Sequence, residues 1–378
     1  MTEVGTVPSH HLRNYIAPAA PATRRACDGT EPEMRVEFGF TPRWYRDRCG
    51  IDFSERYHLD PLSRRECLVA MKKELNRQFP DLCLGGPNPE ETPATLDGVH
   101  GALVVPMIFG VRPEYYPDNW PAPKPGVMTE AEVEALEVPE LSGVSVFAQL
   151  VEQMDTIERE FGRIEGFINW QGVLNTAFRL RGHEIFIDLL EKTSLARHLF
   201  DVISKTMIEG ARFVYARQAR TGVIVRHFSV SNCVVNMVSP ALYREHLMPY
   251  DRRISDAFEH FGIHNCAWNV DPYVADYASI RTLGYVDMGL ESDLVRAKEI
   301  CPDTRRAIMY TPTDLAAKPE ERIWGDLVRI RRELSPCDVV AADIETDTPE
   351  ERVRMFADMA RKTLEAGSTS PSPCRRGI

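Results

Sequence analysis

Two residues with the chemistry of a metal site, His264 and Cys266, lie two positions apart in the short segment 263–269. Its apolar residues and the preceding Gly262 predict a β-strand, on which residues i and i+2 project from the same face. A neutral imidazole and a thiolate are two of the ligands that zinc prefers. The alternative is that His264 donates a hydrogen bond to a carbonyl group and Cys266 packs as a small apolar side chain.

Composition and charge narrow the class of protein. The chain has 378 residues, of which 43% are hydrophobic and 27% charged, a balance typical of a globular protein. Its net charge is −11, and its basic residues cluster only in pairs. A nucleic-acid partner is not expected, because phosphate binding needs a clustered basic surface.

The spacing of the cysteines and the length of the apolar runs predict where in the cell the protein is located. Nine cysteines are scattered without a paired framework, which favours reduced thiols and a cytoplasmic protein without structural disulfides. No apolar run approaches about 18 residues, so we expect no membrane span. The segments 1–33 and 367–378 are predicted to be mobile tails, because the first carries Pro, Ala and His without an apolar core and the second is rich in Ser, Pro and Gly.

Eight short apolar segments recur along the chain, each followed by a helical pattern or a long loop. They are 36–40, 102–109, 164–170, 223–230, 263–269, 285–290, 307–310 and 338–344. This alternation predicts an α/β protein with a single (β/α)₈ TIM barrel over residues 34–366 and long loops above the C-terminal mouth. An open doubly wound sheet is the competing fold, but no glycine-rich phosphate-binding turn follows any of these segments.

Active sites of such barrels lie at the carboxyl ends of the strands. Acid, imidazole, thiol and amide side chains follow several of the predicted strands, which favours an enzyme over a binding protein. The residues expected there besides His264 and Cys266 are Arg43, Trp44, Tyr45, Arg112, Asn169, Trp170, Gln171, His227, Asn232, Trp268, Asn269, Asp287, Tyr310, Asp343 and Glu345.

An ordered set of motifs resembles the uroporphyrinogen decarboxylase superfamily over residues 37–366. The set is Gln171-Gly172, Arg181-Gly182, Val238-Ser239-Pro240-x-x-Tyr243, Met248-Pro249-Tyr250, His264-x-Cys266 and Thr348-Pro349-Glu350-x-Arg352-Val353. The resemblance is closer to the zinc-dependent corrinoid and thiol methyltransferase branch than to the porphyrinogen decarboxylases. His264-x-Cys266 is similar to the zinc motif of that branch, whereas the arginine- and glycine-containing N-terminal signature of the decarboxylases is not evident.

One position departs from that branch. Its second cysteine precedes the Thr-Pro of the last helix by a few residues, and the corresponding residue here is Ala342, followed by Asp343. Cys337 lies before the strand, about six residues away, so it is expected near the opposite rim. We therefore expect Asp343 to be the third zinc ligand, because a carboxylate is an accepted ligand.

The resemblance implies a zinc-dependent transfer of a methyl group involving a small thiol, with a corrinoid carrier protein as a partner. His264, Cys266 and Asp343 would hold zinc, and Glu345 is a further candidate for the shell. Asp287 and Asn232 would orient the substrate. The residues expected to contact substrate are Arg43, Trp44, Tyr45, Arg112, Asn169, Trp170, Gln171, His227, Trp268, Asn269 and Tyr310. The sequence is also compatible with a homo-oligomer.

Two other functions remain open. A cofactor-free decarboxylase or lyase would bind a carboxylated substrate through Arg43, Arg46 and Arg112 and use an acid such as Asp287 for the proton. A barrel without catalytic activity would act as a binding partner. Activity that survives chelation would favour the decarboxylase over the methyltransferase.

Overall fold

A computed structural model describes residues 11–12, 29, 31–124 and 126–368. Its central element is a sheet of seven parallel strands in the order β1-β2-β9-β8-β7-β6-β5. The strands are β1 His11–Leu12, β2 Met34–Phe40, β5 His227–Ser231, β6 His260–His264, β7 Leu283–Met288, β8 Arg305–Tyr310 and β9 Cys337–Ile344, and a separate hairpin pairs β3 Pro113–Glu114 with β4 Ala122–Pro123.

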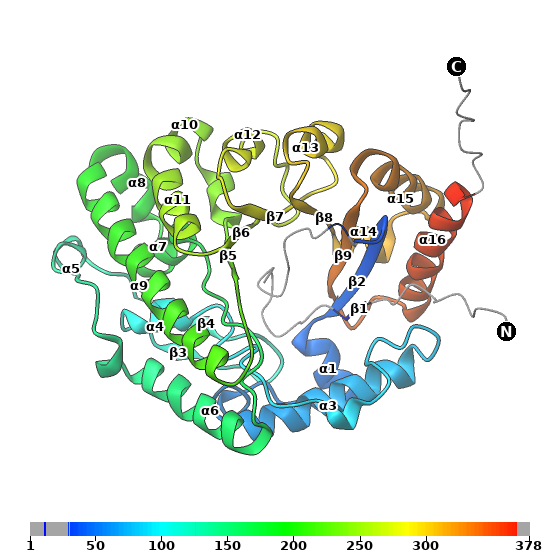
Figure 1. Cartoon of the computed structure of the whole chain (residues 1–378), viewed down its shortest axis with the longest axis horizontal. Helices are drawn as coiled ribbons and strands as arrows, with labels where there is room; N and C mark the ends of the chain where they lie inside the picture. The colour runs from blue at the N-terminus through cyan, green and yellow to red at the C-terminus, as the bar shows by residue number, and fades with distance from the viewer. Residues whose placement is uncertain (1–10, 13–28, 30, 125, 369–378) are drawn as a thin grey trace.

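Helices surround the sheet on its outer side (Figure 1). In the first half of the chain they are α1 Pro42–Cys49, α2 Glu55–Leu59, α3 Pro61–Gln78, α4 Val104–Ile108, α5 Glu130–Glu134, α6 Ser145–Phe161, α7 Val173–Arg181, α8 Glu184–Glu191 and α9 Thr193–Arg220. In the second half they are α10 Pro240–Leu242, α11 Met248–Asp256, α12 Val274–Ala278, α13 Leu294–Ile300, α14 Pro312–Ala317, α15 Glu320–Leu334 and α16 Glu350–Ser368. Short turns of other helical types are η2 Pro89–Glu91, η3 Leu141–Gly143, η4 Cys233–Met237 and η5 Tyr243–Leu247.

Six of the eight predicted strand segments form strands of the sheet. The segment 102–109 does not: it contains α4, whose residues Val104, Val105 and Ile108 are buried on a helix. The segment 164–170 is extended, but its pairing is one isolated parallel bridge between Glu165 and Thr95. The pairing of the described strands therefore does not close, and the sheet is an α/β arrangement compatible with a barrel.

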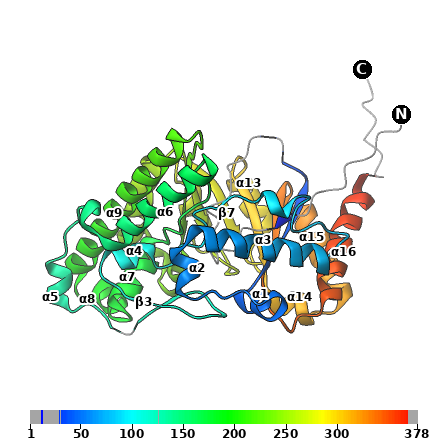
Figure 2. The same ribbon diagram turned by 90° about the horizontal axis from the view of Figure 1, so that it is seen from below.

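The gap in the strand pairing is bridged by side chains and by helices. Gln218 of α9 donates hydrogen bonds to the carbonyl oxygens of Ile164 and Gly166, so the extended segment has partners without a strand beside it. Helices α3 and α6 run below this part of the molecule, between the β2 side and the β5 side (Figures 1 and 2). The missing strands are thus replaced by packing against helices.

The strand register defines an inner and an outer face of the sheet. Tyr285 pairs with Arg305, Ala307 with Asp338, and Met309 with Val340, so their side chains share the inner face. Tyr285, Ala307, Met309, Val340 and Ala342 form a buried apolar cluster there. The alternate residues pack outward against the helices.

The helix starts predicted from capping residues and prolines agree with the structure. The Ser239 side chain accepts a hydrogen bond from the Leu242 backbone N–H and caps α10, with Pro240 at the first helical position. Helix α16 begins at Glu350, directly after Thr348-Pro349.

The described helices contain no segment with the length and low charge that crossing a bilayer requires.

The predicted tails lie mostly outside the described residues. Residues 1–10, 13–28 and 30 of the N-terminal segment and residues 369–378 of the C-terminal segment are not described. The described part of the N-terminal segment includes β1, which pairs in parallel with β2, and Glu33, which forms an ion pair with Arg331. At the other end, α16 continues to Ser368.

Candidate metal centre

Three side chains with metal-binding atoms meet at the carboxyl ends of two neighbouring strands. They are Cys233, His264 and Cys266, whose ligand atoms all lie within 4.8 Å of one another. His264 is the last residue of β6, and Cys233 begins η4 just beyond the end of β5. The predicted pair therefore belongs to a group of three.

Strand register explains why Cys233 joins the pair. Ser231 pairs with His264, and the Asn232 N–H donates to the His264 carbonyl oxygen at 2.8 Å. Cys233 follows Ser231 by two residues, as Cys266 follows His264. Cys266 has φ 63°, a left-handed conformation that turns the chain at the strand end. This turn lets the short thiol and the longer imidazole converge, although same-face residues of a straight strand are about 6.6 Å apart.

A buried carboxylate fixes the orientation of His264. The Asp287 Oδ2 atom lies 2.6 Å from His264 Nδ1 and also accepts a hydrogen bond from the Tyr285 hydroxyl at 2.9 Å. Asp287 Oδ1 accepts the Asn265 backbone N–H at 2.8 Å. The protonated Nδ1 atom thus donates to Asp287, and Nε2 is left as the coordinating atom. This carboxylate–histidine arrangement is typical of metal-binding histidines.

The Nε2 atom of His264 is a buried polar atom that has no hydrogen-bond partner among the described residues. The His264 side chain is fully buried. An unsatisfied buried polar atom costs free energy, on the order of 1–3 kcal/mol. A cation held between Nε2 and the two thiols of the group would satisfy this atom.

The two thiols are electrostatically unequal. A hydrogen bond from Cys233 lowers the pKa of Cys266, and the His264 imidazole lowers it further against the opposing effect of burial. The hydrogen bond to Cys266 and burial together raise the pKa of Cys233 well above its usual value. Burial alone would lower the pKa of His264, but Asp287 and the Cys266 sulfur outweigh it and raise that pKa. The site therefore stabilises the Cys266 thiolate even without a metal ion.

The donor set fits zinc. Two sulfurs and one imidazole nitrogen are ligands of structural and catalytic zinc sites, and three protein ligands leave a fourth position for substrate. Ligand atoms on one tetrahedral zinc are roughly 3.5 Å apart, given bonds of about 2.0–2.3 Å. The observed limit of 4.8 Å requires only a small contraction of the group.

Asp343, the expected third ligand, is not part of this group. Side chains alternate along β9, and the inward position beside Val340 is taken by Ala342, which is 3% exposed. Asp343 is exposed and has φ 55°. The structure instead brings Cys233, which follows the strand next to β6, beside His264 and Cys266.

Asp343 instead lines a pocket of about 570 Å³ beyond the carboxyl ends of β2 and β9. Glu345 lines it too, and its Oε2 atom accepts a hydrogen bond from the Thr41 hydroxyl at 3.2 Å. Arg43 lies in the same pocket and forms an ion pair with Asp118 at 3.0 Å. The residues predicted at the carboxyl ends of β2 and β9 therefore lie together in this pocket, and they are not part of the group of Cys233, His264 and Cys266.

Several aromatic residues predicted to contact substrate lie in the hydrophobic core. Trp44 and Tyr45 are 1% and 2% exposed and pack against Phe40. Trp170 packs against Phe228 on the outer face of the sheet. Tyr310 also faces outward, and its hydroxyl donates to Asp326 of α15. Trp and Tyr bury large apolar areas, and here packing determines their position.

The polar residues of the prediction fall into two groups. Asn169 accepts hydrogen bonds from Gln171, and the Asn232 side chain donates to buried Asp251 at 2.8 Å, so these amides support the chain near the site. His227 lies at the start of β5, four residues before Ser231, and bonds to Ser229. The exposed residues are Arg112, Trp268 and Asn269.

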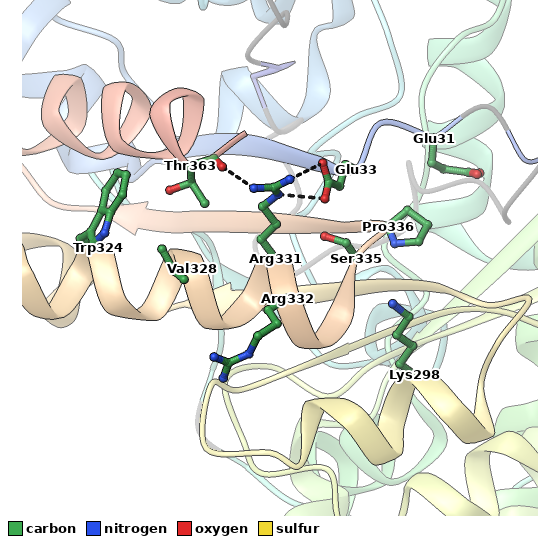
Figure 3. Close-up of a pocket in the computed structure, with 10 residues that line it drawn as sticks. All are labelled: Glu31, Glu33, Lys298, Trp324, Val328, Arg331, Arg332, Ser335, Pro336 and Thr363. Atoms are coloured by element: carbon green, nitrogen blue, oxygen red, sulfur yellow. Dashed lines mark hydrogen bonds and ion pairs between the residues drawn. The ribbon is translucent and has the colours of Figure 1, made fainter. Parts of the chain in front are cut away.

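A second pocket, of about 730 Å³, lies at the opposite ends of the strands (Figure 3). Its lining residues Ser335 and Pro336 precede β9, and Glu33 precedes β2. Arg331 closes one side by bonding to Glu33 at 2.8 Å and to the Thr363 carbonyl oxygen at 2.6 Å. Active sites of parallel α/β folds lie at the carboxyl ends of the strands, so this pocket is not the candidate active site.

Sequence reasoning missed Cys233 and Tyr285. The signal for Cys233 was a cysteine two residues beyond the end of a strand adjacent to the His-x-Cys strand. The signal for Tyr285 was its i, i+2 spacing from Asp287 on one strand face. Neither signal is specific without the strand order.

Comparisons with known proteins support the fold. No protein-family model and no curated protein matches this sequence. The structure is similar to that of a methyltransferase from Methanosarcina mazei, with a TM-score of 0.60, 16% sequence identity, and coverage of 86% of this chain and 94% of that chain. The chain thus has a methyltransferase-like fold, and at the carboxyl ends of its strands it carries a group of two cysteines and a histidine that could bind a metal.

Proposed function

We propose that this protein is a zinc-dependent methyltransferase of the uroporphyrinogen decarboxylase superfamily, with a small thiol as the methyl acceptor. The observation that carries the proposal is the buried Nε2 atom of His264, which has no protein partner among the described residues and lies beside two thiols. The fold shared with a methyltransferase supports the proposal at the level of architecture.

The residues of the site have separate tasks in this proposal. Cys233, His264 and Cys266 would hold zinc, which lowers the pKa of a bound thiol and keeps it as a thiolate at neutral pH. Asp287 keeps His264 in the tautomer with a free Nε2, and Tyr285 and the Asn265 N–H hold Asp287 in turn.

The acceptor thiolate attacks the methyl carbon of the donor in line. A sulfur–carbon bond forms as the bond between the methyl group and the donor breaks, and the bonding electron pair leaves with the donor. A corrinoid carrier protein is the donor that the resemblance implies. It would have to bind at the carboxyl ends of the strands, where the metal group lies.

The competing decarboxylase needs free arginines for substrate carboxylates. Arg43 forms an ion pair with Asp118, and Arg46 donates to the Pro117 carbonyl oxygen. Arg112 is exposed on the hairpin segment. Two of the three arginines are therefore engaged within the protein, whereas the group of two cysteines and one histidine fits a metal.

Zinc content of purified protein tests the proposal. We expect close to one zinc per wild-type chain, loss of zinc in Cys233→Ser and Cys266→Ser, and unchanged zinc in Asp343→Ala. Cys83→Ser is the matched control, because Cys83 is an exposed cysteine outside the group. A metal-free wild type that transfers methyl groups would overturn the proposal. Loss of zinc in Asp343→Ala would restore Asp343 as a ligand.

A further inference from the structure

The pocket of about 730 Å³ at the amino ends of the strands contains a polar group that the protein leaves unsatisfied. This group is the hydroxyl of Ser335, a residue that is 8% exposed and whose Oγ atom has no hydrogen-bond partner among the described residues. The nearby Cys337 thiol does not satisfy it, because sulfur is a weak acceptor. Figure 3 shows the Ser335 oxygen pointing toward the side of the pocket where Arg331 lies. A ligand in the pocket that bonds this hydroxyl would remove the cost of burying it unpaired.

The positive charge of the pocket is only partly neutralised. Arg331 pairs with Glu33 at 2.8 Å. Arg332, at the rim, pairs with Glu333. Lys298 of α13 is half-buried in the lining and has no hydrogen bond or ion pair with any residue in the described ranges. Its amine is therefore available to an anion that enters the pocket.

A buried guanidinium behind the pocket wall adds to this positive charge. Arg306 of β8 is 2% exposed and donates hydrogen bonds to carbonyl oxygens, among them the oxygen of Pro336 in the pocket lining at 3.2 Å. Its Nε atom has no partner, and no carboxylate in the described part of the chain forms an ion pair with it. Glu31, the remaining acidic residue of the lining, accepts a backbone N–H of its own segment. Two cations without a carboxylate partner and one carboxylate thus lie at this end of the pocket, in a chain whose net charge is −11.

The other end of the pocket is aromatic and apolar. Trp324 and Val328 line it from α15 and are 36% and 37% exposed, although Trp is usually largely buried. Figure 3 shows both on the opposite side of Arg331 from Ser335. Trp324 and Ser335 are separated by about 16 Å along the helix axis, given a rise of about 1.5 Å per residue. A ligand that contacts both ends needs an anionic group at one end and a flat ring at the other.

We infer that this pocket binds a phosphorylated small molecule with an aromatic ring, of the nucleotide class. The phosphate oxygens accept hydrogen bonds from the Lys298 amine and the Ser335 hydroxyl, and the ring packs on Trp324. The volume of the pocket lies within the range of about 300–1,000 Å³ that is usual for small-molecule sites. The inference is independent of the proposed function, because the metal group lies at the other ends of the strands.

Calorimetry with three probes tests the inference: ADP, adenosine, which lacks the phosphates, and pyrophosphate, which lacks the ring. We expect wild type to bind ADP at least about tenfold more tightly than either of the others. Lys298→Gln and Ser335→Ala should each weaken ADP binding by about tenfold. Lys205→Gln is the matched control, because Lys205 is exposed on α9 on the opposite side of the molecule (Figures 1 and 2). Ser335→Ala should keep the wild-type melting temperature, because the deleted hydroxyl has no partner.

Failure of ADP to bind at millimolar concentration, or ADP binding that is unchanged in Lys298→Gln, overturns the inference. Equal affinity for ADP and pyrophosphate overturns the assignment to the nucleotide class. Cys266→Ser should bind ADP as wild type does, and loss of binding in this variant would place the nucleotide at the metal group. If Ser335→Ala misfolds, Trp324→Ala tests the other end of the pocket and should bind ADP no better than pyrophosphate. Absence of zinc from wild type would count against the proposed function alone.

Discussion

At the scale of single residues, the site depends on a chain of buried hydrogen bonds behind His264. Tyr285 donates to Asp287, and Asp287 holds the Nδ1 side of the imidazole. The three side chains share the inner face of adjacent strands β6 and β7, so their order follows from the strand register. Tyr285 and Asp287 orient the imidazole and do not coordinate a metal, because their side-chain oxygens are already hydrogen-bonded within the protein.

Asp287→Asn is expected to weaken zinc binding by about 10- to 100-fold, the range typical of partners that orient metal-binding histidines. Asp287 accepts hydrogen bonds at both of its oxygens, whereas Asn must place its NH₂ group against one of the donors. Competition with a chelator of known affinity measures the effect. Tyr285→Phe should cost less, because Asp287 keeps two of its three donors.

Asp343→Asn provides the control for this prediction, since Asp343 lies in the separate pocket at the ends of β2 and β9. Its zinc affinity should equal that of wild type. An Asp287→Asn protein with wild-type zinc affinity would show that the carboxylate does not orient the ligand.

At the scale of elements, the segment after β6 is held by the segment after β7. The Gly289 N–H donates to the Trp268 carbonyl oxygen at 2.8 Å. A Cβ atom at Gly289 would lie 2.0 Å from the Ala267 carbonyl oxygen, and Ala267 follows Cys266 directly. The close approach of these two segments therefore controls the position of one cysteine of the metal group.

Gly289→Ala should lower the free energy of unfolding by about 1–3 kcal/mol, the range typical of overpacking, and should weaken zinc binding. Gly325→Ala makes the same chemical change in α15, where no atom lies within 4 Å of the added Cβ. This control should raise stability by up to about 1 kcal/mol, because Ala is the better helix former. Denaturant unfolding and chelator competition measure both variants. Similar effects of the two substitutions would contradict the role of the close contact.

At the scale of the whole molecule, three buried histidines tie stability to pH. Burial lowers the pKa of His58 to about 3, of His100 to about 4 and of His227 to about 3. A histidine whose pKa is lowered by folding contributes stability at pH values above about 6.5, which is its pKa in the unfolded chain. This contribution is lost as the pH falls. Asp251 opposes the trend, because burial raises its pKa to about 6 and its protonation below that pH favours the folded state.

The free energy of unfolding should therefore fall by several kcal/mol between pH 6.5 and pH 4, since three histidines outweigh one carboxyl. Urea unfolding at pH 7, 5.5 and 4 measures this loss. In His58→Asn the pH dependence should be reduced by about half, because one of three similar histidines is removed while Asp251 still offsets most of the effect of another. The Asn side chain can still donate to the Gly98 carbonyl oxygen that His58 Nδ1 contacts. A pH-independent stability in this range would contradict the prediction.

Much of the element pattern was predictable from the sequence because it is local. Six strand segments were identified from apolar runs, and the start of α10 from Ser239-Pro240. The segment 102–109 was misassigned because a short apolar run is equally compatible with a buried helix, and α4 buries both Val104 and Ile108. The segment 164–170 has strand-like composition, but no neighbouring strand pairs with it beyond one bridge.

The sequence by itself determined that His264 and Cys266 lie close together at the end of one predicted strand, because they are two residues apart. In the structure β6 ends at His264, and Cys266 lies in the turn beyond it. The third donor was decided by tertiary structure. Ala342 takes the inward position of β9 and leaves Asp343 outside, whereas the pairing of Ser231 with His264 brings Cys233 beside Cys266. Which strands are neighbours, and which residues are level with one another, depends on the packing of the whole sheet, and no local spacing along the chain encodes it.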